Sequence, residues 1–294
     1  MHRRRASRLV AIAIASFAIS CSSADDNAAP VATPSVTVVT QTAAIGNPIE
    51  MEYRFAVAPG APPVTGDYMV FVHFLDTDGE LMWTDDHEPP TPVRQWKAGG
   101  TVMYTRTMFI PKFPYVGQTR VEVGLFSPSS GDRLPLTGQT RGQRSYEVAN
   151  FEMRLQSDNL FVIFRDGWHE TEVGGEGSGL EWQWSRKDAT LSFPNPKRDV
   201  EVYLQLDQPV AAFDTPQRVE IRAGAETVDS FPLPTGRPEL RRIKLSAGQL
   251  GTAETVELTV SVDRTFVPAT VPRLKSNDPR ELGVRVFRAF VQPL

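Results

Sequence analysis

The amino-acid sequence predicts an all-β protein with two tandem antiparallel β-sandwich domains of the immunoglobulin-like or jelly-roll-like type. The first observation is a period-two alternation of apolar and polar residues, which sends one set of side chains into a core and the other into water. Residues 49–55, 200–206, 219–222 and 256–262 show it clearly. The second observation is that Gly and Pro clusters break these runs at short intervals, as between the strands of sandwiches. No segment longer than about ten residues keeps a helical repeat without such a break.

The first 20 residues have the composition of a secretory signal. Four arginines stand within residues 3–8, and residues 9–19 form an apolar stretch. That stretch is too short to cross a bilayer, which needs about 20 helical residues. The sequence therefore predicts a signal peptide over residues 1–20 and not a membrane-spanning helix.

Residues 18–21, Ala-Ile-Ser-Cys, resemble the lipobox of bacterial lipoproteins, although that motif usually has Leu first and Gly or Ala before the Cys. The resemblance implies that Cys21 is lipidated and anchors the mature chain to a membrane. Cys21 is the only cysteine, and a lone free thiol would be a liability in an oxidising compartment. Ser22 stands where retention at the inner membrane usually requires Asp. The resemblance therefore implies a lipoprotein of the cell envelope, anchored to the outer membrane.

Length and composition predict how the chain after the signal peptide is divided into domains. Removing 20 residues from 294 leaves 274, which suits two domains of ordinary size. Residues 21–35 are rich in Ala, Pro, Asp and Asn and are expected to form a disordered tether. The first sandwich is expected over residues 36–150, a linker over 151–158, and a second, jelly-roll-like sandwich over 159–294.

The charge balance disfavours nucleic acid as a partner. The leader contains four arginines and no acid, so the mature chain has 27 Lys and Arg against 35 Asp and Glu, a formal charge of −8. The sequence also lacks the basic stripe that a polyanionic nucleic acid would need.

A hairpin is predicted in the first domain, where residues 70–75 and 81–83 flank the sequence Asp-Thr-Asp-Gly at 76–79. Oxygen ligands from its acids would suit Ca²⁺, but the spacing is not that of a calcium loop, so no cofactor is expected. A zinc site at His73 and His87 is disfavoured, because a strand histidine beside aromatic residues is usually a core residue with satisfied hydrogen bonds. The weak metal-ligand candidates are Asp76, Asp78, Asp85 and Asp86.

Both domains resemble accessory modules of bacterial envelope proteins. In the first, the motifs at residues 71–74, 78–79, 85–90, 96–99, 123–126 and 133–136 resemble a β-sandwich module found on the soluble ends of membrane glycosyltransferases. In the second, the motifs at 167–170, 182–185, 189–191 and 278–284 are similar to jelly-roll-like modules on proteins of surface-polysaccharide synthesis. The resemblance implies a carbohydrate-associated role without an assigned reaction. Residues 279–283 are expected to form a helical turn before a last strand at 284–291.

Tryptophans supply the candidate ligand-binding residues. Aromatic rings can stack on the C–H faces of sugars while a few polar groups orient the hydroxyls. Trp168 and Trp96 stand next to loop signals and are expected to form exposed platforms, with Glu170 beside Trp168. Trp182 and Trp184 are two residues apart on a predicted strand, so they share one face, which is expected to be the core.

The leading interpretation is a non-catalytic envelope lipoprotein that binds a glycan or a component of the surface-polysaccharide machinery. One alternative is a scaffolding lipoprotein without a small ligand, in which Trp168 is packed. The other is a glycan-modifying hydrolase, which requires two carboxyl groups at a defined separation. The acids available for it near the tryptophans are Glu170, Glu172, Glu176 and Glu181. No Gly-x-Ser-x-Gly motif supports a serine nucleophile, and no cysteine remains for thiol catalysis once Cys21 is lipidated.

Overall fold

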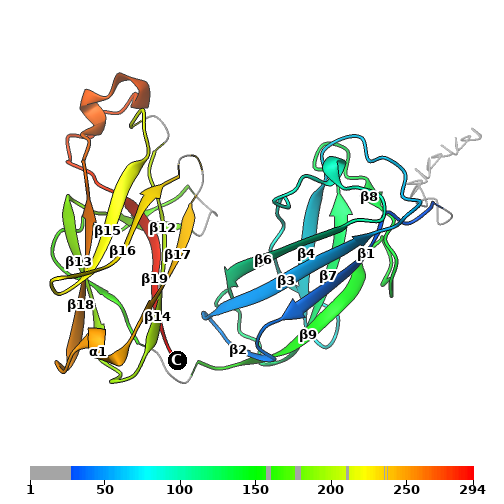
Figure 1. Cartoon of the computed structure of the whole chain (residues 1–294), viewed down its shortest axis with the longest axis horizontal. Coiled ribbons are helices and arrows are strands. Elements are labelled where there is room, and N and C mark those ends of the chain that lie inside the picture. Colours follow the sequence, from blue (N-terminus) through cyan, green and yellow to red (C-terminus); the bar gives the residue numbers. More distant parts are fainter. Residues whose placement is uncertain (1–27, 157–159, 176–179, 210–211, 235, 237) are drawn as a thin grey trace, which may run out of the picture. The chain divides into compact units, whose positions relative to one another are not determined.

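The computed structural model describes residues 28–156, 160–175, 180–209, 212–234, 236 and 238–294. The all-β prediction is confirmed, since almost every regular element is an antiparallel strand (Figure 1). The chain divides into two compact units, one ending at Met153 and the other formed chiefly by residues 154–294. Among the described residues, no helix is long and apolar enough to cross a membrane. Cys21 lies outside the described residues, so its lipidation stays a prediction.

Two antiparallel sheets form the first unit. The smaller has the order β1-β3-β6, with β1 Ala32–Val38, β3 Pro48–Val57 and β6 Thr101–Phe109. The larger has the order β2-β9-β7-β4-β5, with β8 paired to β7. Its strands are β2 Thr42–Ala44, β9 Tyr146–Arg154, β7 Gly117–Phe126, β4 Met69–Leu75, β5 Leu81–Thr84 and β8 Arg133–Leu134. A short 3₁₀ helix, η1, spans Val93–Gln95.

Alternation along β3 builds one wall of the first core. Ile49, Met51, Tyr53 and Phe55 are all buried, and the polar residues between them point away from the core. Rings from the larger sheet, among them Phe74, are buried as well. The predicted hairpin is present as β4 and β5 around the turn, where Gly79 has φ of +87°.

Both predicted boundaries of the first domain need correction. Ala32–Ser35, assigned to the tether, belong to β1, because Ala32 and Pro34 occupy inward positions in the alternation with Val36 and Val38. Pro34 is tolerated there because β1 is an edge strand and needs no N–H donor on its free side. Residues 151–154, assigned to the linker, continue β9, where Phe151 and Met153 are buried.

The second unit contains two five-stranded antiparallel sheets, which form the two layers seen in Figure 1. One has the order β10-β13-β18-β15-β16, with β10 Ile163–Phe164, β13 Asp188–Pro194, β18 Thr255–Val262, β15 Gln217–Ala223 and β16 Glu226–Leu233. The other has the order β11-β12-β19-β14-β17, with β11 Glu172–Val173, β12 Glu181–Trp184, β19 Arg285–Pro293, β14 Val200–Asp207 and β17 Glu239–Leu245. Between the layers lies the main core, which includes Val202, Leu204, Leu191 and Val260. A single helical turn, α1 (Ala247–Leu250), follows β17.

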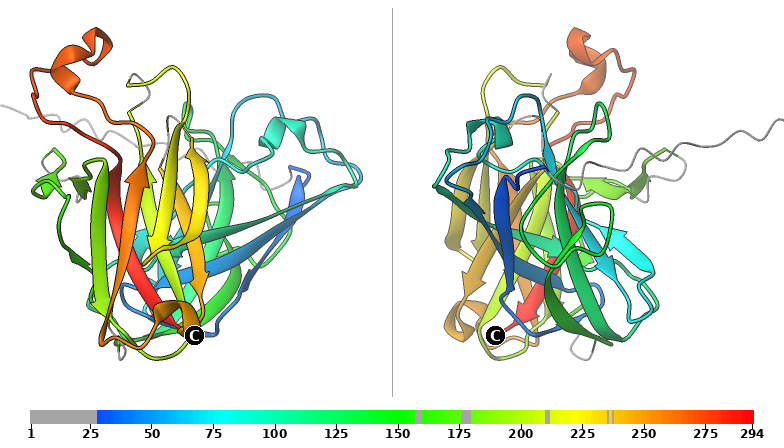
Figure 2. Two further views of the ribbon diagram at one scale, coloured as in Figure 1. Left: turned by 60° about the vertical axis from the view of Figure 1, so that its left-hand side comes forward. Right: turned by 90° about the vertical axis from the view of Figure 1, so that its right-hand side faces the viewer.

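The segment between β18 and β19 positions the candidate site. It projects beyond the ends of the strands (orange in Figure 2) and carries two 3₁₀ helices, η2 Pro268–Thr270 and η3 Pro272–Leu274. The expected helical turn at 279–283 is wrong. Leu282 instead pairs with Phe266, each backbone N–H donating to the other's carbonyl oxygen at 2.8–2.9 Å. This pairing folds the segment back on itself and brings residues 278–285 beside β12.

Candidate ligand-binding site

Trp168 is packed and not an exposed platform. Its indole Nε1 donates a hydrogen bond to the carbonyl oxygen of Thr190 at 2.8 Å, and its ring meets Phe164 edge-on with centroids 4.8 Å apart. A β-bridge pairs the backbone of Trp168 with that of Ser185. The indole packs on the main core. The prediction of an exposed Trp168 is therefore wrong. Glu170 is exposed and lies outside the linings of the cavities described below.

Trp96 is also part of the fold. It lies after η1 in the first unit and is half-buried against Phe55, with ring centroids 4.9 Å apart. Its Nε1 donates to the carbonyl oxygen of Thr91 at 2.9 Å. Much of its surface and its one donor are thus used within the protein, contrary to the expectation of an open platform.

Trp182 and Trp184 share one face of β12, as predicted, but that face looks away from the main core. Trp184 is 7% exposed and belongs to a small cluster with Phe266 and Leu282. Trp182 is half-buried and packs against that cluster. The expectation that both rings lie in the core is therefore wrong for Trp182.

A cavity of about 270 Å³ opens beside these two tryptophans. Its apolar walls come from β12, the paired segment and η3, and include Trp182, Trp184, Phe266 and Leu274. Its polar groups come from three separate stretches of the chain: Glu172, Ser276, Asp278, Arg280 and Arg285. Aromatic walls with a few convergent polar groups are the ordinary composition of a small-molecule site.

The polar groups form one connected network. Glu172 on β11 lies directly across from Trp182, and its Oε2 accepts a hydrogen bond from the indole Nε1 at 3.1 Å. The other oxygen of Glu172 accepts from Arg280 Nη2 at 2.7 Å. Arg280 also donates from Nε and Nη2 to the carboxylate of Asp278, at 3.0 and 2.6 Å. A single guanidinium thus joins two carboxylates beside the indole.

Both members of the Asp278–Arg280 pair are charged at neutral pH. Hydrogen bonds from Arg280 hold the pKa of the Asp278 carboxyl below its usual value, and those bonds in turn raise the pKa of Arg280. Because charged groups make stronger hydrogen bonds than neutral ones, this pair gives the cavity lining strong acceptors and donors for a ligand.

Arg285 lines the cavity and lies against three aromatic rings. Its guanidinium carbon is 5.2 Å from the ring centroid of Trp182, 5.5 Å from that of Trp184 and 4.7 Å from that of Phe287. These separations are within the range of cation–π attraction. Arg285 also pairs with the carboxylate of Asp207 on β14. A cation whose position is fixed by Asp207 therefore lies against both tryptophan rings.

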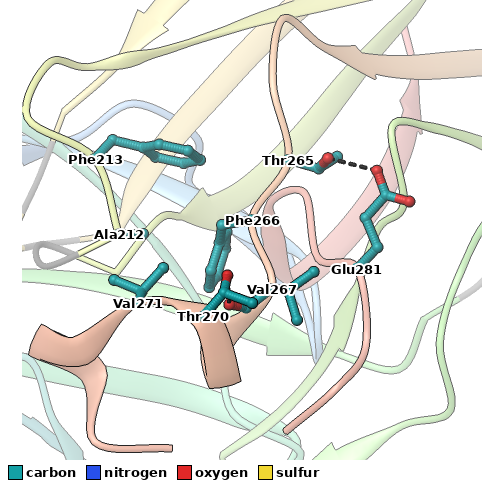
Figure 3. A pocket seen from close by; sticks show the side chains of 8 residues that line it. All are labelled: Ala212, Phe213, Thr265, Phe266, Val267, Thr270, Val271 and Glu281. Atoms are coloured by element: carbon teal, nitrogen blue, oxygen red, sulfur yellow. Dashed lines mark hydrogen bonds between the residues drawn. The ribbon is translucent and has the colours of Figure 1, made fainter.

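A second cavity, of about 470 Å³, lies nearby and also uses Phe266 as a wall (Figure 3). Phe213 faces Phe266 across it, edge to ring, with centroids 5.6 Å apart. Its polar side chains are engaged with one another or with backbone: Thr265 donates to Glu281 at 2.5 Å, and Thr270 donates to the carbonyl oxygen of Val267 at 2.8 Å. The second cavity is therefore mainly apolar and has fewer groups to orient a ligand.

The acids of the first-domain hairpin serve the backbone. Asp76 Oδ1 accepts from the N–H groups of Asp78 and Glu80, both at 2.9 Å, and so closes the turn. Asp86 Oδ1 accepts from the N–H of Val72 at 3.0 Å. Asp78 is exposed at the tip. Asp76 and Asp86 bond to different backbone groups, so these carboxylates do not form one site.

Asp85 belongs to a buried polar cluster. It accepts two hydrogen bonds from Arg106, at 2.8 and 3.0 Å. Beside it, His87 Nε2 is 2.8 Å from the hydroxyl of Tyr104, whose ring stacks on Tyr53. Burial, helped by the charge of Arg106, lowers the pKa of His87 to about 4. His87 is therefore neutral at physiological pH and acts as a structural link between the loop and β6.

The two histidines of the suggested zinc site have separate partners. His73 on β4 lies against Phe71, with centroids 4.8 Å apart, whereas His87 is bonded to Tyr104. Within the part of the chain that the structure describes, no three His, Cys, Asp or Glu side chains gather closely enough to hold a metal ion.

Of the acids considered for hydrolysis, the structure brings only Glu172 into the cavity. Glu181 is exposed and sits one residue away from Trp182, hence on the opposite face of β12. Glu176 lies outside the described residues. The second carboxylate of the cavity is Asp278, which the sequence analysis placed only within the motif at 278–284.

Comparisons with known proteins leave the chain unassigned. No family model matches the sequence, and no curated protein matches it. Among solved structures, it is similar to the alkylpurine DNA glycosylase AlkC of Pseudomonas fluorescens, with 16% identity over 42% of this chain and 31% of that one and a TM-score of 0.25. It is similar to a carbohydrate-binding module of Cellvibrio mixtus lichenase 5A, with 9% identity over 47% of this chain and 99% of that one and a TM-score of 0.28. A tandem module pair from Paenibacillus barcinonensis Xyn10C has 11% identity over 85% and 79% of the two chains and a TM-score of 0.25. At these scores the likenesses carry no argument about function.

Proposed function

We propose that the second unit binds a glycan in the cavity beside Trp182 and holds it without cleaving it. The observation that carries the proposal is the combination, in one cavity, of a half-buried indole with a charged hydrogen-bonding network. Trp182 lines that cavity together with Glu172, Asp278 and Arg280. A sugar ring needs both kinds of surface, because it has C–H faces and hydroxyl edges.

The network is ordered before a ligand arrives. Trp182 Nε1 is bonded to Glu172, and Arg280 is bonded to Glu172 and Asp278. Side chains that are already fixed lose little conformational entropy on binding, which favours affinity. The carboxylate oxygens can accept hydrogen bonds from sugar hydroxyl groups, and the guanidinium can donate to ring or hydroxyl oxygens.

The electrostatics of the cavity favour binding over hydrolysis. Glycoside hydrolysis needs one carboxyl group that is protonated near neutral pH, usually through an apolar environment that raises its pKa. Here Arg280 bonds to both cavity carboxylates and lowers the pKa of Asp278. A carboxylate held in that state is a poor proton donor, so the cavity is better suited to hold a sugar than to cleave one.

We further propose that Cys21 carries acyl chains that attach the protein to the outer membrane, facing either the periplasm or the surface. This rests on the resemblance of residues 18–21 to a lipobox. Growth with labelled palmitate tests it: the wild-type chain incorporates label and Cys21→Ser does not. If Cys21→Ser still incorporates label, or if neither chain does, the proposal that Cys21 is lipidated is wrong.

The glycan-binding proposal is tested on an array of bacterial glycans with the mature chain carrying Cys21→Ser, compared with Trp182→Ala. Loss of an aromatic stacking surface worth about 1.4 kcal/mol weakens binding roughly tenfold. Trp96→Ala is the matched control, because Trp96 is another half-buried indole with one hydrogen bond, in the other unit. If neither the Cys21→Ser chain nor its Trp182→Ala variant binds any glycan of the array, although both are folded, the result favours the scaffolding alternative. In that alternative the chain contacts only proteins of the polysaccharide machinery.

A further inference from the structure

The ring of Phe266 is a wall shared by the two cavities of the second unit. It meets Trp184 of the first cavity edge-on, with centroids 5.8 Å apart, and Phe213 of the second cavity edge-on, with centroids 5.6 Å apart. The aromatic walls of the two cavities are therefore only two ring contacts apart. A ligand that fills the first cavity needs only a short extension to enter the second.

The folded-back segment separates the two cavities. Val267 lines the second cavity, whereas the next residue, Pro268, lines the first. In the same way Glu281 lines the second cavity and Leu282 lines the first. Because the backbones of Phe266 and Leu282 are paired, one stretch of paired chain forms the partition between the cavities.

The second cavity exposes apolar side chains that a ligand could cover. Phe213, Val267 and Val271 line it and are each only half-buried (Figure 3). Its two threonine hydroxyl groups already donate hydrogen bonds within the protein. Covering apolar surface is favourable in proportion to the area removed from water. The lining therefore suits an apolar group, in contrast to the charged network of the first cavity.

Phe213 is held in position by an arginine. The guanidinium carbon of Arg264 lies 4.8 Å from the centroid of the Phe213 ring. Arg264 Nη2 is itself fixed, since it donates to the carbonyl oxygens of Thr215 at 2.8 Å and Pro216 at 2.7 Å. A wall that is ordered in this way loses little conformational entropy when a ligand binds.

The charge of the second cavity disfavours a free fatty acid. Glu281 contributes an exposed carboxylate to the lining, and none of the described residues that line this cavity is a lysine or an arginine. The carboxylate of a fatty acid would be repelled by Glu281. An acyl chain joined to a sugar through an ester or an amide has no such charge.

We propose that the glycan held beside Trp182 carries an acyl chain, joined to its sugar by an ester or amide, and that this chain lies in the second cavity against Phe213. The proposal rests on the glycan-binding function above and names the class of glycan. The second cavity, at about 470 Å³, is larger than the first, at about 270 Å³. A single acetyl group would leave most of it empty, so a chain of several carbons is expected.

The probes are glucosamine and galactosamine N-acylated with chains of two, four, six and eight carbons, together with octanoate. Binding to the full mature chain carrying Cys21→Ser is measured by calorimetry. Each methylene group that becomes fully buried strengthens binding by about fourfold. The expected result is an affinity roughly tenfold or more higher with eight carbons than with two, and no measurable binding of octanoate.

Two substitutions locate the acyl chain. Phe213→Ala removes a wall of the second cavity, so it should abolish most of the gain with chain length and leave the affinity for the two-carbon compounds nearly unchanged. Val271→Ser makes another wall polar with a smaller change in packing, and it should reduce the same gain. Phe161→Ala is the matched control, because Phe161 is a 68% exposed phenylalanine of the same unit that lines neither cavity. Thermal unfolding of each variant verifies its fold.

The outcomes separate this inference from the proposed function. Trp182→Ala should weaken every compound of the series by a similar factor, because it acts on the sugar. If chain length has no effect, or if the series does not bind while the array retains a glycan without an acyl chain, the cavity beside Trp182 stands and the acyl inference is wrong. If octanoate binds as tightly as the eight-carbon amides, the second cavity takes free fatty acids and its link to the glycan is wrong. If neither the series nor any glycan of the array binds, both proposals fail together.

Discussion

Arg285, which lines the aromatic cavity of the second unit, forms a bidentate ion pair with Asp207. Arg285 Nε donates to one carboxylate oxygen of Asp207 at 2.8 Å and Nη2 to the other at 2.6 Å. Asp207 is 6% exposed. Because the guanidinium also lies against Trp182, Trp184 and Phe287, this pair connects the rigid strand β14 to the side chains proposed to hold the ligand.

Asp207→Asn should therefore destabilise the second unit and loosen the cavity. The substitution keeps the shape but leaves the charge of Arg285 without its partner, at an expected cost of about 1–3 kcal/mol. Urea unfolding measures this cost. Asp214→Asn is the control, because Asp214 pairs with Arg273 in an exposed position, where an ion pair contributes about 0–1 kcal/mol. Equal costs for the two variants would contradict the structural role given to Asp207.

Gly283→Ala should displace the segment that supplies Ser276, Asp278, Arg280 and Leu282 to the cavity. A Cβ atom at this position would lie 2.4 Å from the carbonyl oxygen of Arg186 and 2.4 Å from Ser185 Oγ, closer than real atoms approach. The backbone at Gly283 must move, at a cost of about 1–3 kcal/mol, and the paired residues Phe266 and Leu282 should move with it. Gly175→Ala, where nothing lies within 4 Å, should leave stability nearly unchanged. A well-tolerated Gly283→Ala would show that the close approach to Ser185 is not needed.

The first unit should lose stability as the pH decreases from about 6.5 to about 4. The pKa of His87 is about 4 in the folded chain. Between pH 6.5 and 4, His87 is therefore protonated in the unfolded chain but stays neutral in the folded chain. Stability conferred by the neutral ring is complete above pH 6.5 and is lost as the pH falls, by about 3 kcal/mol at most. Unfolding of the first unit, followed from pH 8 to 4, measures the slope.

His87→Gln provides the comparison for that slope. Glutamine can keep a polar contact with Tyr104 but does not titrate, so the variant is expected to be less stable at pH 7 and to lose less stability on acidification. Identical slopes for the two proteins would mean that His87 is not the titrating group.

The strands were predictable from the sequence because alternation is a local signal. The runs in β3, β14, β15 and β18 gave the correct element and the correct inward face. Alternation also placed Trp182 and Trp184 on one face. It could not tell whether that face meets the main core, since this depends on which sheet β12 joins and on which side the sheet is covered.

The cavity itself depends on long-range pairing that no local pattern encodes. Arg280 reaches Glu172 across 108 positions of the chain, through a segment folded back by the pairing of Phe266 with Leu282. The prediction for Trp168 was wrong because a neighbouring Gly suggests a loop, whereas the half-buried indole packs on the main core and bonds to Thr190.

The two tryptophans Trp168 and Trp182 should respond in opposite ways to truncation. Trp168→Ala removes an indole packed on the main core, with its hydrogen bond to Thr190, and should cost about 3 kcal/mol of unfolding free energy without removing a ligand contact. Trp182→Ala removes a cavity wall and should cost less stability but most of the glycan affinity. Parallel measurements of unfolding and glycan binding on both variants decide between the sites. A folded Trp168→Ala protein that has lost binding, beside a Trp182→Ala protein that retains it, would move the binding site to the packed indole and refute the assignment made from the structure.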